Sequence, residues 1–153
     1  MIKIKSALAL LLMAPLLGIA ACGGDEGDDY GSGPQPITVK THLAFPPGDV
    51  GGPKGEVLDG STIGDSPFCV GGTFHDGSET GPIGSVTRSF HCSDGTLQIS
   101  FSMSDESRSP TGNWTVDIGY GDLTGFSGGG DMKAVFEPKA REGHETFTGT
   151  VTP

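Results

Sequence analysis

The segment from Gly125 to Gly129 reads GFSGG and matches G-x-S-x-G, the pattern around the serine nucleophile of many hydrolases. In those enzymes the serine stands on a sharp turn between a strand and a helix. Here the residues that follow, 131–136, alternate like a strand instead. Glycine occurs 27 times in the chain, so a chance match is easily reached. We therefore predict that Ser127 is not a nucleophile, and we assign no catalytic residue.

Arg88 is the residue whose charge could hold a ligand. In the segment VTRSFHC it shares one strand face with Val86, Phe90 and Cys92. If that face points inward, the guanidinium needs buried partners and could grip an anionic ligand. A bulge before Arg88 would turn it to solvent, and we favour this interpretation because an unpaired buried arginine is rare. Arg88 is kept as a candidate ligand-binding residue.

Two aromatic residues complete the candidate ligand-binding set. In the segment NWTVDIGY, alternation predicts a strand with Trp114, Val116, Ile118 and Tyr120 on one face. This phase favours Trp114 as a core residue over a ligand platform. Trp114 and Tyr120 are nevertheless kept with Arg88 as candidates for ligand binding.

The four histidines, at positions 42, 75, 91 and 144, fall in separate predicted strands. Several of them, together with Asp76, could supply ligands to zinc, but no two form a local ligand pair in the sequence. Histidines scattered in this way are more often surface residues. We predict no metal site and no cofactor.

Cys69 and Cys92 are predicted to form a structural disulfide. Outside the cytoplasm the two cysteines of a domain usually join. Their spacing also lacks the close C-x-x-C arrangement of metal and redox sites. In the chain-entropy model such a cross-link stabilises a domain by about 3 kcal/mol.

The first residues read as a secretion signal. Two lysines precede a short apolar run over residues 6–19, which Pro15 interrupts. The segment LGIAAC, ending at Cys22, resembles a bacterial lipobox, in which a lipid such as palmitate is attached to the cysteine and cleavage leaves that cysteine first. We predict a signal peptide over residues 1–21, lipidation of Cys22, and an extracytoplasmic protein anchored to the cell membrane or outer membrane. An ordinary secreted protein with a chance cysteine is the alternative.

Residues 22–35 are predicted to be an acidic, glycine-rich tether, because they hold too few apolar side chains to fold. The formal net charge of the chain is −10, and loss of residues 1–21, which hold Lys3 and Lys5, makes it −12. A chain this acidic does not bind nucleic acid by neutralising phosphates. Residues 36–153 are long enough for one domain.

Period-two alternation recurs along residues 36–153, and no segment shows sustained helical spacing. Asp94-Gly95 marks a hairpin tip between two such segments. The glycines between positions 119 and 130 predict a turn at a barrel rim, with Leu123 and Phe126 tucked inward. About eight short strands at regular spacing predict an all-β fold, a small antiparallel barrel, with a β-sandwich as the alternative.

Residues 112–151, GNWTVDIGYGDLTGFSGGGDMKAVF and ETFTGTV, resemble a pattern of small secreted bacterial proteins. Those proteins are similar to the allene oxide cyclase and dirigent barrel superfamily, and residues 69–92 share the resemblance more loosely. The resemblance implies an eight-stranded antiparallel barrel. Tyr120 departs from the pattern, which has a small residue or threonine there. No position matches the catalytic residues of the plant enzymes, so none is carried over.

Two classes of function are compatible with this barrel. The first is a non-catalytic ligand-binding or surface-interaction module, with a small apolar or anionic ligand in the barrel mouth. The second is a cyclase-like or dirigent-like enzyme that acts on a small apolar substrate inside the barrel. The first is favoured because no acid–base pair or nucleophile stands out. A small barrel can also be filled by its own side chains, in which case its outer surface would carry the function.

Overall fold

The computed structural model describes residues 30–45, 47–48, 52–77, 85–104 and 108–153. The predicted signal peptide, Cys22 and residues 22–29 of the predicted tether lie outside the described residues. Where the chain is described, its regular structure is entirely β. No helix in this part of the chain is long and apolar enough to cross a membrane.

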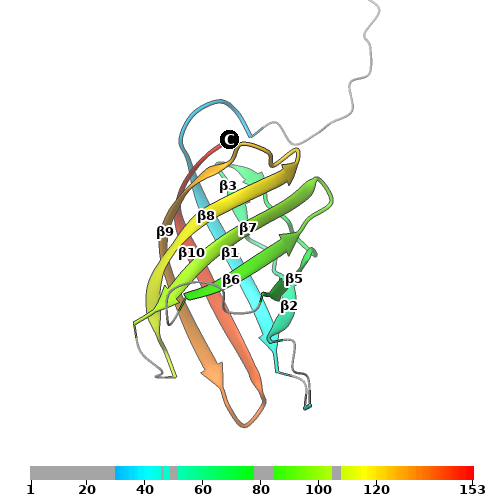
Figure 1. Cartoon of the computed structure of the whole chain (residues 1–153), viewed down its shortest axis with the longest axis vertical. Helices are drawn as coiled ribbons and strands as arrows, with labels where there is room; N and C mark the ends of the chain where they lie inside the picture. The colour runs from blue at the N-terminus through cyan, green and yellow to red at the C-terminus, as the bar shows by residue number, and fades with distance from the viewer. Residues whose placement is uncertain (1–29, 46, 49–51, 78–84, 105–107) are drawn as a thin grey trace, which may run out of the picture.

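Eight strands close into an antiparallel barrel in the order β1-β2-β5-β6-β7-β8-β9-β10, and β10 pairs back onto β1 (Figure 1). Two further strands, β3 and β4, lie outside this ring. The predicted antiparallel barrel is confirmed, and the alternative sandwich is wrong. The strands are β1 (Gln35–Ala44), β2 (Lys54–Val57), β3 (Thr62–Ile63), β4 (Ser66–Pro67), β5 (Thr73–Asp76), β6 (Ser85–His91), β7 (Gly95–Met103), β8 (Thr111–Gly121), β9 (Ser127–Glu137) and β10 (Glu142–Thr152).

Side-chain alternation decides which face of each strand lines the barrel. In β1, Ile37, Val39 and Leu43 are at most 2% exposed, whereas Lys40 between them is exposed. Successive side chains of a strand point to opposite faces, so one face can be apolar and the other polar. The hairpin predicted at Asp94-Gly95 joins β6 to β7 as expected.

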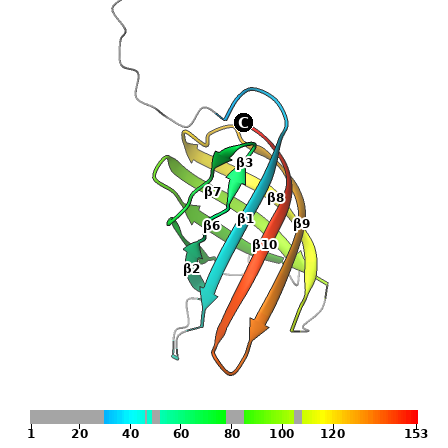
Figure 2. The same cartoon turned by 180° about the vertical axis from the view of Figure 1, so that it is seen from behind.

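The wall between β1 and β6 is built from short pieces. β2 covers the half of β1 from Thr41 to Ala44, and β3 pairs with β1 at Ile37 and Thr38 (Figure 2). The predicted disulfide is present here: Cys69, just before β5, joins Cys92, just after β6, with their Cα atoms 4.8 Å apart. The cross-link therefore ties the short wall to the longer strands.

Aromatic and aliphatic side chains close the end of the barrel at which β8 connects to β9. Leu123 and Phe126, in the connection between β8 and β9, are buried as predicted. Tyr30 packs its ring edge-on against Phe126, with ring centroids 5.6 Å apart, and its hydroxyl donates to the carboxylate of Asp94. Tyr30 belongs to the predicted tether, and it lies packed against this end of the barrel.

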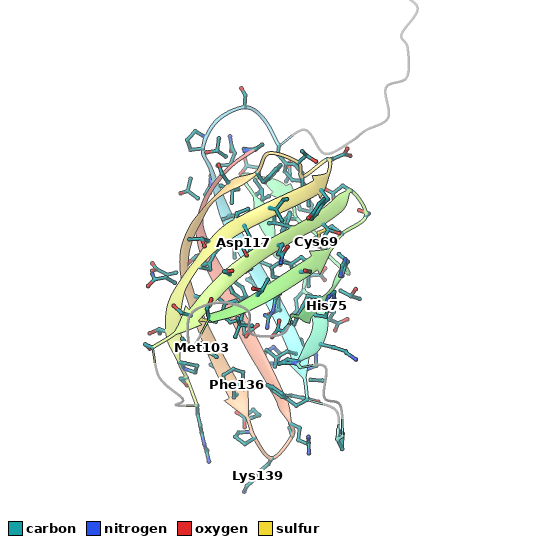
Figure 3. The ribbon with its side chains drawn as sticks, viewed as in Figure 1. Cys69, His75, Met103, Asp117, Phe136 and Lys139 are labelled. Carbon is teal, nitrogen blue, oxygen red and sulfur yellow. A yellow bond between two sulfur atoms is a disulfide. The ribbon has the colours of Figure 1, made fainter. Side chains whose placement is uncertain are left out.

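A bulge in β8 breaks the predicted alternation. Ile99 pairs with Val116 and Gln98 pairs with Ile118, so Asp117 is an extra residue on β8 (Figure 3). Such a residue reverses the phase of the strand beyond it. Before the bulge, Trp114 is 2% exposed; beyond it, Ile118 is 43% and Tyr120 is 53% exposed. The prediction of one shared face is wrong for Ile118 and Tyr120.

Candidate functional site

A cluster of charged side chains lies inside the barrel. Asp76 on β5 is directly opposite Arg88 on β6, and Thr41 on β1 is directly opposite Glu145 on β10. Residues directly opposite one another in an antiparallel pair point to the same face of the sheet. All four are buried, and we call them the inner cluster.

The hydrogen bonds of the inner cluster converge on Arg88, which is 1% exposed. Its Nε donates to Oδ1 of Asp76 at 2.5 Å and its Nη2 donates to Oδ2 at 2.9 Å, forming a bidentate pair. Its Nη1 donates to Oε2 of Glu145, which also accepts from the hydroxyl of Thr41 at 3.0 Å. Bidentate pairing fixes the orientation of the guanidinium as well as compensating its charge.

Aromatic rings surround the same guanidinium. Its central carbon lies 4.1 Å from the ring centroid of Phe74, 5.0 Å from that of Phe101 and 5.7 Å from that of Phe147. A cation over an aromatic face is attracted by the ring, more strongly where water is excluded. The rings therefore add to the stabilisation that the carboxylates give Arg88.

The pKa of Arg88 lies above its ordinary value. Burial by itself lowers this pKa, because it disfavours the charged form. The negative charge of Glu145 and the hydrogen bonds and charge of Asp76 raise it by more. Arg88 therefore stays cationic inside the barrel.

The favoured interpretation of Arg88 as a solvated residue is wrong. The pairing of β6 with β7 runs without a shift from Ser85 to His91, so no bulge turns Arg88 outward. The interpretation assumed that a buried arginine would lack partners, and the fold supplies two. A signal for them was present in the sequence, since Asp76 and Glu145 each lie two residues from an aromatic core residue on the same strand face.

Aromatic rings pack against one another in the interior beside the inner cluster. The ring of Phe147 makes edge-on contacts with those of Phe90, Phe101 and Trp114, at centroid distances of 6.1, 5.5 and 6.4 Å. The indole Nε1 of Trp114 donates to the carbonyl oxygen of Thr148 at 3.1 Å, which agrees with a core role. Among the described residues, every buried side-chain nitrogen and oxygen has a hydrogen-bond partner.

Hollows are present on the outer wall of the barrel. One, of about 500 Å³, is lined mainly by exposed polar residues of β8, β9 and β10, among them Asn113, Asp131 and Lys133. A smaller one, of about 200 Å³, lies over β6, β7 and β8 and includes Ser102 and Thr115. Both present hydroxyl, amide or charged groups to solvent.

Ser127 is an exposed residue at the start of β9. The strand predicted after it is confirmed, so the strand–turn–helix geometry of a nucleophile elbow is absent at this serine.

The four histidines, scattered in sequence, form one band on the outer face. His144 on β10 lies opposite His42 on β1, which in turn lies opposite Glu56 on β2. Glu56 lies opposite Thr73 on β5, and Thr73 lies opposite His91 on β6. The fourth, His75, is two residues from Thr73 on β5. We call the four histidines with Glu56 and Thr73 the histidine band.

Within the band the imidazoles meet as two pairs. Nε2 of His91 is 3.0 Å from Nδ1 of His75, and both residues are exposed. The rings of His42 and His144 have centroids 5.0 Å apart. In the part of the chain that the structure describes, no three or more His, Cys, Asp or Glu residues are grouped closely enough to hold a metal ion. Sequence reasoning predicted surface histidines, which is correct, but it missed their pairing.

Comparison with known proteins gives no match: no family model, no curated protein and no solved structure is similar to this chain. The resemblance of residues 112–151 to the allene oxide cyclase and dirigent barrels therefore stays a prediction, as do the candidate ligand-binding roles of Arg88, Trp114 and Tyr120.

Proposed function

We propose that this protein is a lipid-anchored, extracytoplasmic surface-interaction module without catalytic activity. The observation that carries the proposal is that the candidate ligand-holding residues inside the barrel already have partners within the chain. Arg88, the strongest candidate for holding a ligand there, already donates to Asp76 and Glu145. Trp114, a second candidate, packs on Phe147 and donates to a backbone carbonyl.

The outer wall of the barrel has exposed features that a partner could contact. It carries two hollows, the histidine band, and the exposed side chains of Ile118 and Tyr120. Tyrosine is one of the residue types enriched in protein interfaces. The negative charge of the chain favours a partner with a basic surface, because opposite charges steer association.

The extracytoplasmic part of the proposal rests on the lipobox-like segment and on the disulfide. Disulfides persist in oxidising compartments and are rare in the cytosol. The bond between Cys69 and Cys92 agrees with that location. The lipid anchor rests on the sequence pattern around Cys22, which lies outside the described residues.

The test is native mass spectrometry of the full chain, expressed in a bacterium and extracted from its membranes in detergent. We expect a chain that begins at Cys22 and carries covalent acyl groups. We also expect no other small molecule to be retained. The variant Cys22→Ser should stay unprocessed and without acyl groups, which makes it the control for the anchor.

Either of two results would contradict the proposal. A reproducible non-covalent mass that leaves on denaturation would mean that the barrel holds a ligand, and would favour the ligand-binding or cyclase-like alternative. A measured mass that shows no acyl groups at Cys22 would contradict the lipid anchor and would favour the alternative of an ordinary secreted protein.

A further inference from the structure

We propose that His75 and His91 form a binding site for a divalent transition-metal ion of the kind that imidazole binds, such as Zn²⁺ or Cu²⁺. The two side chains come from neighbouring strands, β5 and β6, and their facing ring nitrogens are 3.0 Å apart. Imidazole nitrogens are common ligands of zinc, copper and nickel in proteins. The site lies on the outer wall, because both histidines are exposed, and it is therefore independent of the barrel interior.

The spacing of the two nitrogens is close to the one a metal needs. With Zn–N bonds of 2.0–2.1 Å and tetrahedral angles, two histidine ligands have nitrogens about 3.3 Å apart. The observed separation of 3.0 Å has to open by a few tenths of an ångström, and the two rings, whose planes are 17° apart, have to turn so that both lone pairs point at one ion. Rotation of two exposed side chains can supply that change without moving the strands.

A third side chain fixes which nitrogen of His91 faces the site. The Nδ1 atom of His91 is 3.3 Å from the hydroxyl oxygen of Thr96, its directly opposite neighbour on β7. When Nδ1 carries the proton and donates to that hydroxyl, Nε2 keeps its lone pair for a metal. Metal-binding histidines regularly donate their second ring nitrogen in this way, which orients the ring. Thr96 is therefore a positioning residue.

The backbone around the pair is held firmly. His75 lies opposite Ser89, and Thr73 opposite His91, in the pairing of β5 with β6. The disulfide between Cys69 and Cys92 joins the segments just outside these strands. Figure 3 shows Cys69 and His75 along the same side of the barrel. A preformed spacing lowers the ordering cost of binding.

The exposure of His75 and His91 to solvent determines what kind of metal site they can form. Both histidines are exposed, so water can occupy the other coordination positions of the ion. Such a site resembles catalytic or exchangeable metal sites more than closed structural ones. Lys54 on β2 lies directly opposite His75 in the sheet, and neither residue closes the site from solvent. We therefore expect reversible binding.

The second histidine pair provides the contrast. The ring nitrogens of His42 face carboxylates, with Nε2 3.6 Å from Glu142 and Nδ1 4.0 Å from Glu56. Both nitrogens of His42 are thus directed at carboxylates and not at the ring of His144. His42 and His144 are thus an internal control, with the same residue type on the same band.

The test is a Zn²⁺ titration of the full chain carrying Cys22→Ser, kept in detergent, so that no unlipidated fraction with a free Cys22 thiol competes for the metal. The ring-proton NMR signals of the four histidines report binding one residue at a time. We expect the signals of His75 and His91 to change together and saturate at one equivalent of Zn²⁺. A chelator should reverse the change.

Substitutions separate metal binding from a simple hydrogen bond. In His75→Asn and His91→Gln the amide group replaces the facing ring nitrogen, so hydrogen bonding can persist while the imidazole ligand is lost. Each should weaken Zn²⁺ binding at least about tenfold, since even loss of an outer-shell partner costs 10–100-fold. Thr96→Val should weaken it less, and His144→Gln should leave it unchanged.

Three results would overturn the proposal. One is a titration without saturation of the His75 and His91 signals. Another is an equal response of all four histidines, which would show no preference for this pair. The third is unchanged affinity in His75→Asn and His91→Gln. The three histidine substitutions are at exposed positions, so the unfolding midpoint without metal should stay the same and confirm that these variants fold.

Discussion

The inner cluster and the four histidines of the histidine band lie on the same four strands, β1, β5, β6 and β10, on opposite faces. Three neighbouring pairs in sequence divide between them: Thr41 and His42 on β1, His75 and Asp76 on β5, and His144 and Glu145 on β10. On β6, Arg88 points inward and His91 outward.

The inner cluster and the histidine band differ in what supplies the hydrogen-bond partners of their polar groups. Inside, carboxylates and a guanidinium satisfy one another, because burying an unpaired charge is costly. Outside, water can complete any hydrogen bond that the protein does not make. Ionisable groups in this barrel therefore have a structural role inside and remain available to ligands outside.

The largest expected effect is that of Arg88→Ala, which would break the inner cluster. Removing the guanidinium leaves Asp76 and Glu145 buried without a counter-charge. Loss of one partner of a buried ion pair costs about 3–5 kcal/mol. Urea unfolding should show that loss of stability, whereas His91→Ala on the same strand should change it by less than about 0.5 kcal/mol. Equal effects of the two substitutions would contradict the comparison.

A triple variant sharpens the same point. Arg88→Met with Asp76→Asn and Glu145→Gln removes all three charges together. It should be less destabilised than Arg88→Ala alone, because no buried charge is left uncompensated.

The sign of the pKa shift sets the pH range for this measurement. Since the folded state raises the pKa of Arg88, the stability it contributes is fully present below the ordinary arginine pKa and is lost only above it. The effect of Arg88→Ala should therefore be the same at neutral and at mildly alkaline pH.

An intermediate effect is expected where one covalent bond supports both regions. Cys69→Ala with Cys92→Ala removes the cross-link beside β5 and β6, the strands that carry Arg88, Asp76, His75 and His91. Stability should fall by about 3 kcal/mol in the chain-entropy model. Thermal unfolding of the oxidised parent, the reduced parent and the double variant checks this. A reduced parent as stable as the oxidised one would contradict it.

The smallest effect is expected on the outward-facing end of β8. Tyr120 is 53% exposed, so Tyr120→Ser should change the free energy of unfolding by no more than about 0.5 kcal/mol. Trp114→Ala on the same strand should cost about 3–5 kcal/mol, because it leaves a cavity in the core. Chemical denaturation of both variants checks the bulge at Asp117. A large loss for Tyr120→Ser would mean that Tyr120 packs inward.

Local sequence patterns predicted those features that depend only on neighbouring residues of the same strand. The alternation of Ile37, Val39 and Leu43 predicts an inward face without knowledge of any other strand. The bulge at Asp117 escaped prediction because an extra residue is defined by the strand it pairs with. The burial of Arg88 escaped for a related reason, since its partners lie 12 and 57 residues away along the chain.

The sequence by itself determined the all-β character, the hairpin at Asp94-Gly95, the cysteine pairing and the identity of every charged group, because these follow from residue types and short-range spacing. Closure of the sheet into a barrel decided which side chains from distant strands meet. Pairing of β10 with β1 brought Glu145 to Arg88, and pairing of β5 with β6 brought His75 to His91. Contacts of this kind depend on strand order and register around the whole ring, which no local stretch of sequence encodes.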